Sequence, residues 1–343
     1  RDLVRSRGLG DVYKRQGNRT ATDTHPMRGL LINKPYETGV NDFLEKSITL
    51  GIISPSQDAL RFYQFLENQN SKIKKHNDKD NYIIDYEGFF AIYGVSLSFP
   101  TPNDNEWERI NEPLIMGIKE TAQQIKQLIC DSIVKISSTT RRKIIVIYIP
   151  QRWEPYTSYQ LDGESFDLHD YVKAFCAEKG IMSQLIREKT INDTIQKCQI
   201  HWWLSLSFFV KSFRTPWILA NTNNTTAFAG LGYSVENKKD INGHIVLGCS
   251  HIYSSNGEGL KYKLAKISND KIQWRHKKPH LCYDDAYEFG KSIVNLFYES
   301  MNELPKRVVI HKRTFYTDEE KQGIIDSISD LSLIHISEPT RPY

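Results

Sequence analysis

Hydrophobic and polar positions along the first two thirds of the chain form blocks that predict strands and helices in turn. Ser47–Ile53 and Lys143–Ile149 are continuous apolar runs, which is typical of strands buried on both faces of a sheet. A helical period follows the first run from Ser54 to about Asn68, and another covers about Pro113 to Lys135. Strands that alternate with helices predict a parallel α/β sheet.

The pattern between and after these blocks predicts further elements. Tyr86–Phe90 and the alternating Val95–Phe99 indicate an edge strand, and the polar stretch Ser71–Asn81 indicates a loop. A helix is expected around His169, capped by Ser165 at its start and ended by Gly180, because an apolar stripe repeats there at helical spacing.

Two apolar segments come next. Ile181–Ile186 follows a glycine and predicts the next strand, whereas His201–Lys211 is apolar on nearly every face and predicts a buried helix. The aromatic residues of that helix are therefore interpreted as core and not as base-stacking groups. Tyr156 and Tyr159, in a polar loop, are the better stacking candidates.

A second region begins near Pro216, and its pattern changes to hairpins. Three strands, one helix and one more strand are expected, at Thr226–Val235, His244–Tyr253, Leu260–Ile267, Asp284–Glu303 and Arg307–His311. This order suits the first part of an RNase H-like fold. The chain is thus predicted to hold two α/β domains.

Composition narrows the function only slightly. With 39% hydrophobic and 25% charged residues the chain has the composition of an ordinary globular protein. A formal net charge of +4 is too small to indicate nucleic-acid binding without a local motif. Five cysteines without a C-x-x-C pair predict neither a disulfide framework nor a zinc site, and they fit a reducing cytoplasm. No apolar run has the length of a membrane span, so no membrane role is expected.

Both ends of the chain look foreign to the rest. Residues 1–16 and 332–343 resemble translated sequencing-adapter sequence, and they are set aside from the fold prediction as artefacts. The expected natural part covers residues 17–331, with both true termini missing.

Four polar residues stand out as a candidate anion site. His169 and Lys173 are one helical turn apart and therefore project together, while Gln184 lies on the next predicted strand. Lys211 ends the apolar helix, where a lysine must be neutralised or meet an anion. An imidazole, an amide and two ammonium groups suit a terminal phosphate. The alternative is two solvated helix faces and a Lys211 whose stem lies along apolar surface.

A family resemblance favours the anion site. The elements His-x-x-x-Lys, Ser-Gln-Leu-Ile-Arg-Glu and Val-Lys-Ser-Phe-Arg-Thr-Pro-Trp, between Asp167 and Trp217, resemble the MID domain of prokaryotic Argonautes of the short type. The resemblance implies a Rossmann-like MID domain over residues 17–215, including an entry segment, and an incomplete RNase H-like PIWI domain over residues 216–331. It also implies that His169, Lys173, Gln184 and Lys211 bind the 5′-phosphate of a guide strand, with a possible Mg²⁺ at that end.

The same resemblance bears on catalysis. An RNase H-like nuclease needs strand-end carboxylates to hold two divalent cations. The alignment with PIWI places Gly232 and Arg313 at two of those positions, so we expect a catalytically inactive protein. Arg187, Lys312 and Arg313 are candidates for contacts with a nucleic-acid backbone instead. Two alternatives stay open, namely an active guided endonuclease and a plain α/β nucleic-acid-binding module.

The resemblance finally implies partners. Relatives of the short type suggest a small guide, with RNA favoured, and a complementary target, with DNA favoured. They also suggest an effector protein that carries an APAZ segment joined to a sirtuin-like, TIR or nuclease domain and acts in prokaryotic defence. Base pairing would then supply the sequence specificity, and the protein would hold the backbone.

Overall fold

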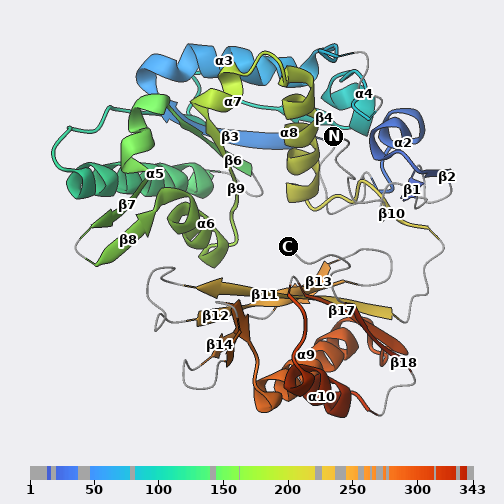
Figure 1. Ribbon diagram of the computed structural model, residues 1–343. Coiled ribbons are helices and arrows are strands. Elements are labelled where there is room, and N and C mark those ends of the chain that lie inside the picture. Colours follow the sequence, from blue (N-terminus) through green and yellow to red (C-terminus); the bar gives the residue numbers. More distant parts are fainter. Residues whose placement is uncertain are drawn as a thin grey trace. The chain divides into compact units, whose positions relative to one another are not determined.

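The computed structural model divides the chain into two compact units, residues 1–217 and 218–343, which are treated separately below (Figure 1). The structure describes residues 14–16, 21–37, 47–77, 82–139, 144–161, 163–220, 226–235, 245–253, 259–262, 265–267, 273–275, 278–312, 314–329 and 333–337.

A parallel sheet forms the centre of the first unit. Its strands lie in the order β4-β3-β6-β9, and β5 also pairs with β3. All of these pairs are parallel, and every residue of β6 is buried, as the apolar pattern predicts. The strands are β3 (Ser47–Pro55), β4 (Ser96–Ser98), β5 (Trp107–Ile110), β6 (Ile144–Ile149) and β9 (Met182–Arg187). The expected α/β fold class with a parallel central sheet is confirmed.

Helices cover both faces of this sheet (Figure 1). Apolar residues of α3 (Ala59–Glu67), α4 (Phe89–Tyr93) and α8 (Lys197–Lys211) form one core cluster with one face. Residues of α5 (Ile118–Thr139) and α6 (Leu168–Glu178) form a second cluster with the other face. Consequently α6 and α8, which carry the two lysines of the candidate site, lie on opposite sides of the sheet.

Short elements complete the first unit. The predicted helix after β3 begins and ends with single 3-10 turns, η1 (Ser56–Asp58) and η2 (Asn68–Asn70). A hairpin of β7 and β8 precedes α6, and its strands pair antiparallel. The others are β1 (Lys14–Gln16), β2 (Ala21–Asp23), α2 (Pro26–Asn33), η3 (Gln151–Tyr156), β7 (Ser158–Leu161), β8 (Glu164–Asp167) and α7 (Glu188–Asn192).

Three sequence predictions for this unit are corrected. The expected edge strand is confirmed within Val95–Phe99, as β4, but not at Tyr86–Phe90, because Phe89–Tyr93 is a short helix between two glycines with positive φ, Gly88 and Gly94. Those glycines allow the chain to enter and leave the turn at backbone angles that other residues rarely adopt. The cap of α6 is Asp167 and not Ser165, since the Asp167 side chain accepts the Asp170 amide. Helix α5 begins at Ile118, later than predicted.

The second unit contains a mixed sheet with strand order β13-β12-β11-β17-β18 and β14 beside β12. Strand β11 pairs antiparallel with β12 and parallel with β17, while α9 and α10 pack together against the core of the unit. The elements are β10 (Ile218–Leu219), β11 (Thr226–Val235), β12 (Ile245–Tyr253), β13 (Gly259–Tyr262), β14 (Ala265–Ile267), β15 (Gln273–Arg275), β16 (Lys278–His280), α9 (Tyr283–Met301), β17 (Arg307–Lys312), α10 (Asp318–Ser327) and β18 (Leu333–Ser337).

Two strands fall within the segments that the sequence analysis sets aside. Strand β1 pairs with β2, and β18 extends the larger sheet beside β17. Among the helices of the described residues, none is long and apolar enough to cross a membrane.

An ion pair lies inside the second unit. Lys312 at the end of β17 donates to both oxygens of Glu320 in α10, at 2.5 and 2.7 Å, and both side chains are buried. Burial raises the pKa of the Glu320 carboxyl, but Lys312 and the Thr317 and Leu281 amides outweigh this effect and hold the pKa below its ordinary value. Glu320 therefore joins β17, the start of α10 and the segment before α9.

A histidine is buried without a hydrogen-bond partner in the first unit. His201 of α8 is fully buried between the rings of Phe65 and Tyr86, and neither ring nitrogen has a partner among the described residues. Burial, followed by the charge of Lys197, lowers the pKa of His201 to about 4. The neutral form is thus the one that the core accepts.

This burial predicts acid sensitivity. The unfolded chain binds a proton at His201 near the ordinary pKa of 6.5, whereas the folded chain binds it only near 4, so stability falls as the pH falls between these values. From pH 7 to pH 5 the folded protein should lose about 2 kcal/mol more than a His201→Phe variant does. Urea unfolding of both proteins at the two pH values measures the difference, and equal losses would contradict it.

The ion pair predicts an asymmetric mutational response. Lys312→Met removes the ammonium from the buried Glu320 carboxylate and leaves His280, whose Nδ1 lies 3.2 Å away, as its basic neighbour, so it should lower the free energy of unfolding by about 3 kcal/mol. The double variant Lys312→Met with Glu320→Gln removes both charges but keeps an acceptor for the helix amides, so it should recover a large part of that loss. Denaturant titrations of the wild type and both variants measure their free energies of unfolding. A double variant that is less stable than Lys312→Met would contradict the prediction.

Candidate functional site

Lys173 projects from the middle of α6 toward the start of β9. Its Nζ donates to the backbone oxygen of Ser183 at 2.5 Å and to the Ser183 hydroxyl at 3.2 Å. Because β9 is the last strand of the described sheet, this carbonyl belongs to an edge strand. Edge strands carry backbone groups that the sheet does not pair.

Lys211 reaches the same place from the other face of the sheet. Its Nζ donates to the Ser183 carbonyl at 2.8 Å and to Gln184 Oε1 at 2.5 Å. The Ser207 hydroxyl, one turn earlier on α8, also donates to Gln184 Oε1 at 2.9 Å. The structure therefore brings Lys173, Gln184 and Lys211 together, and we call these three residues with Ser183 the lysine site.

The electrostatics of the lysine site are unfavourable for two cations. Burial, followed by repulsion from Lys173, lowers the pKa of Lys211 to about 8, and burial also lowers the pKa of Lys173. Within the described residues neither ammonium group has a carboxylate at ion-pair distance, and their acceptors are neutral oxygens. An anion placed here would relieve the repulsion and favour both charged forms.

His169 lies apart from the contacts among Lys173, Ser183, Gln184 and Lys211. Its side chain is 52% exposed, and Nδ1 lies 3.1 Å from Asp170 Oδ1. The structure thus brings together three of the four predicted residues, with His169 one helical turn away on the same helix as Lys173.

One group of side chains in the described part of the chain has the spacing of metal ligands. Oxygen or nitrogen atoms of Asp167, His169 and Asp170 lie within 4.8 Å of one another, and all three residues are exposed. One Asp167 oxygen already accepts the Asp170 amide as the cap of α6. These residues have the right chemistry for a divalent cation, but exposed acids often occur together without one. The Mg²⁺ expected at the guide end stays a prediction.

The β7–β8 hairpin precedes α6 and carries an aromatic surface. The sequence pattern did not predict this hairpin. The rings of Tyr159 and Phe166 stack with centroids 5.4 Å apart, and both residues line an open hollow. Tyr156, by contrast, packs against the core cluster of α5 and α6. Of the two predicted stacking candidates, Tyr159 is therefore the one on the open hollow, where its hydroxyl accepts from the Gln123 amide of α5 at 3.4 Å.

Of the residues predicted in the second unit, Gly232 lies in its expected strand, whereas Lys312 differs from expectation. Gly232 is an exposed position of β11, one residue beyond Leu231, which pairs with Lys312 of β17. Arg313 lies outside the described residues. Lys312 was expected to contact a nucleic-acid backbone, and this is corrected, because its ammonium is buried against Glu320. Arg187, in the first unit, is partly exposed and 4.0 Å from a Glu154 oxygen, and its backbone contact stays a prediction.

Ser183 and Ser207 were not predicted from the sequence as members of the site. A backbone carbonyl gives no signal in a sequence, so the Ser183 contact needed the tertiary structure. Ser207 precedes Lys211 by four residues and therefore shares its helix face, which is a signal that could have been used.

The chain is similar to known proteins in its three-dimensional structure. No protein-family model and no curated protein sequence matches the chain. Among solved structures, the A. aeolicus Argonaute has a TM-score of 0.53 and 15% identity, with 98% of this chain and 40% of that chain covered.

Two further Argonaute structures give similar values. The Clostridium butyricum Argonaute bound to a guide DNA and a 19-mer target DNA has a TM-score of 0.53 and 16% identity, over 96% of this chain and 39% of that one. The Marinitoga piezophila Argonaute in complex with 5′ OH guide RNA and target DNA has a TM-score of 0.51 and 12% identity. The match covers 95% of this chain and 43% of that one.

These identities are low, so the likeness concerns the fold. The chain spans about two fifths of the length of the Argonautes it matches. Within that span the resemblance seen in the sequence is confirmed: the chain has the α/β fold of prokaryotic Argonautes.

Proposed function

We propose that this chain binds the 5′-phosphate of a guide strand at the lysine site and thereby presents the strand for pairing with a complementary nucleic acid. The single observation that carries the proposal is the convergence of Lys173 and Lys211 on one carbonyl oxygen without a carboxylate partner among the described residues. Two partly buried ammonium groups at one point are costly unless an anion joins them.

A terminal phosphate fits this site better than an internal one. It carries more negative charge and more acceptor oxygens, so it can accept from Lys173 and Lys211 at once. Gln184 orients Lys211, because its Oε1 accepts from the Lys211 ammonium while its Nε2 donates to the Leu185 carbonyl. The lysines act as point charges, and release of the Ser183 carbonyl frees their N–H groups. Rotation of the exposed His169 side chain can bring its ring to the same anion, because His169 lies one turn from Lys173.

Similar structures support guided recognition as the wider activity. One of them is bound to a guide DNA and a target DNA, and another is in complex with a 5′ OH guide RNA and a target DNA. For this chain we infer a guide of RNA and a target of DNA. The lysine site favours a phosphorylated end over a 5′-hydroxyl, since a hydroxyl offers no charge to the two ammonium groups.

We further propose that the chain recognises its target without cutting it. Gly232 supplies no metal ligand at the strand position where the alignment expects a carboxylate, and Arg313 would repel a metal at the other. Target binding would then be passed to a separate or fused effector with an APAZ segment in prokaryotic defence. The alternative, an active guided endonuclease, requires carboxylates elsewhere in the protein.

The end preference is the direct test of the lysine site. Oligonucleotides of one sequence with a 5′-phosphate should bind more tightly than those with a 5′-hydroxyl, in both RNA and DNA. Lys211→Met should weaken binding of the phosphorylated strand by about tenfold or more, because a charged hydrogen bond is lost, and should remove most of the preference. Fluorescence anisotropy at fixed salt concentration measures these affinities.

A matched control variant distinguishes the loss of the 5′-phosphate preference from a general loss of positive charge. Lys179→Met removes an exposed lysine just beyond α6, so it should lower the affinity for both ends alike and leave the preference intact. If the wild type binds both ends equally, the chain is better described as a plain α/β nucleic-acid-binding module.

Catalysis is tested separately. The chain, a guide strand and a labelled complementary target are incubated with Mn²⁺ or Mg²⁺, and we expect the target to remain intact on a denaturing gel. A metal-dependent nuclease under the same conditions shows that the target can be cut. A product of defined length that depends on the guide would establish the endonuclease instead.

A further inference from the structure

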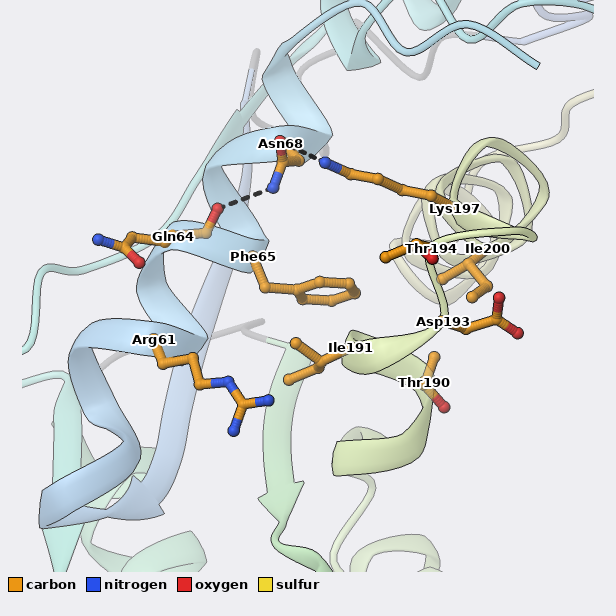
Figure 2. A pocket seen from close by; sticks show the side chains of 10 residues that line it. All are labelled: Arg61, Gln64, Phe65, Asn68, Thr190, Ile191, Asp193, Thr194, Lys197 and Ile200. Carbon is orange, nitrogen blue, oxygen red and sulfur yellow. Dashed lines mark hydrogen bonds between the residues drawn. The ribbon is translucent and has the colours of Figure 1, made fainter. Parts of the chain in front are cut away.

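A second pocket lies in the first unit, between α3, α7 and the start of α8 (Figure 2). Its volume is about 210 Å³, below the roughly 300–1,000 Å³ of pockets that hold drug-sized ligands, so it suits a single ring system. The lining residues are Arg61, Gln64, Phe65, Asn68, Thr190, Ile191, Asp193, Thr194, Lys197 and Ile200.

Three apolar side chains, Phe65, Ile191 and Ile200, lie among the polar residues that line this pocket. Phe65 projects from α3 toward Ile191, with Ile200 beyond it (Figure 2). The ring of His201 lies behind the Phe65 ring at a centroid distance of 5.0 Å, and His201 is fully buried. Phe65 is therefore fixed in place, and because it is only 6% exposed, a planar ligand ring can reach only its outer edge, beside Ile191 and Ile200.

Cations stand on either side of the aromatic ring. Arg61 is held by Glu188 at 2.7 Å and by the Asn192 side chain. Lys197 extends across the pocket to Asn68 Oδ1 at 3.3 Å, and the Asn68 amide in turn donates to the Gln64 carbonyl (Figure 2). A neutral acceptor at 3.3 Å occupies one of the three lysine protons, so two remain for a ligand.

Asp193, the acidic residue of the lining, is bound to backbone amides of its own turn. One Asp193 oxygen accepts the amides of Ile195 and Gln196, which fixes the turn before α8. Figure 2 shows the Asp193 carboxylate turned away from Phe65. The pocket thus offers a small apolar surface with Lys197 at one end and Arg61, paired with Glu188, at the other.

This pocket is separate from the lysine site. Lys197 is the first residue of α8 and Lys211 is the last, so they stand about 20 Å apart along a helix of 15 residues. No residue of the lysine site lines the pocket. A ligand here would be additional to the strand end.

We propose that this pocket binds a nucleoside monophosphate. The base packs against Phe65 between Ile191 and Ile200, and the phosphate lies at the mouth against Lys197 and Arg61. The combination of a flat apolar ring and one anionic group matches the two features of the pocket, and its size admits one base and not two. The proposal does not depend on guide binding at the lysine site.

The experiment must exclude binding at the lysine site, because a nucleoside 5′-monophosphate could also bind there. Calorimetric titrations with AMP, GMP, CMP and UMP therefore use the double variant Lys173→Met with Lys211→Met beside the wild type. We expect the double variant to keep one binding event for at least one of the four nucleotides. The matching nucleoside and inorganic phosphate should each bind at least about tenfold more weakly, since each makes only half of the contacts.

Variants in the pocket complete the test. Lys197→Met should weaken nucleotide binding about tenfold or more, and Ile191→Trp should abolish it by filling the cavity. Lys189→Met removes an exposed lysine of α7 that does not line the pocket and should change nothing. Thermal unfolding shows that each variant is folded.

Three results would overturn the proposal. Binding that disappears in the lysine-site double variant but survives Lys197→Met would assign the nucleotide to the lysine site alone. A nucleoside that binds as tightly as its monophosphate would remove the anionic half of the argument. Absence of binding of all four nucleotides at millimolar concentration would show that the pocket is not a nucleotide site.

Discussion

The desolvation of two like charges beside one edge strand is the constraint on which the functional interpretation depends. Lys173 and Lys211 share the Ser183 carbonyl and lose part of their water, so burial lowers both pKa values, and repulsion from Lys173 lowers the pKa of Lys211 further. A folded protein tolerates such a cost where the groups have a task that requires it. A phosphate at this point would attract both ammonium groups and offset their mutual repulsion, which favours its binding.

The parallel sheet makes this meeting of lysines possible. Helices α6 and α8 pack on opposite faces, so their side chains can approach each other only around the edge of the sheet. Strand β9 is that edge among the described strands, and its Ser183 carbonyl and Gln184 side chain provide the acceptors. The placement of β9 next to the fully buried β6 therefore fixes the geometry of the site.

Buried polar groups have different roles in the two units. In the second unit Lys312 and Glu320 neutralise each other, and Glu320 also caps α10, so these charges tie elements together and leave nothing for a ligand. In the first unit the lysines meet neutral oxygens, and His201 stays neutral in an aromatic core. The sign and the partner of each buried group, and not burial alone, separate a structural group from a binding group.

The amino-acid sequence by itself determined the order and type of most elements, because apolar periodicity reports burial directly: the runs of β3, β6 and β11 and the stripe of α9 were predicted close to their observed bounds. It also named Lys173, Gln184 and Lys211, partly through family resemblance. Only the tertiary structure decided that His169 turns outward, that Lys312 is buried and that Phe89–Tyr93 is a helix. The physical reason is that each of these depends on a partner or a backbone angle, such as Glu320 for Lys312 or the positive φ of Gly88, that hydrophobic periodicity does not encode.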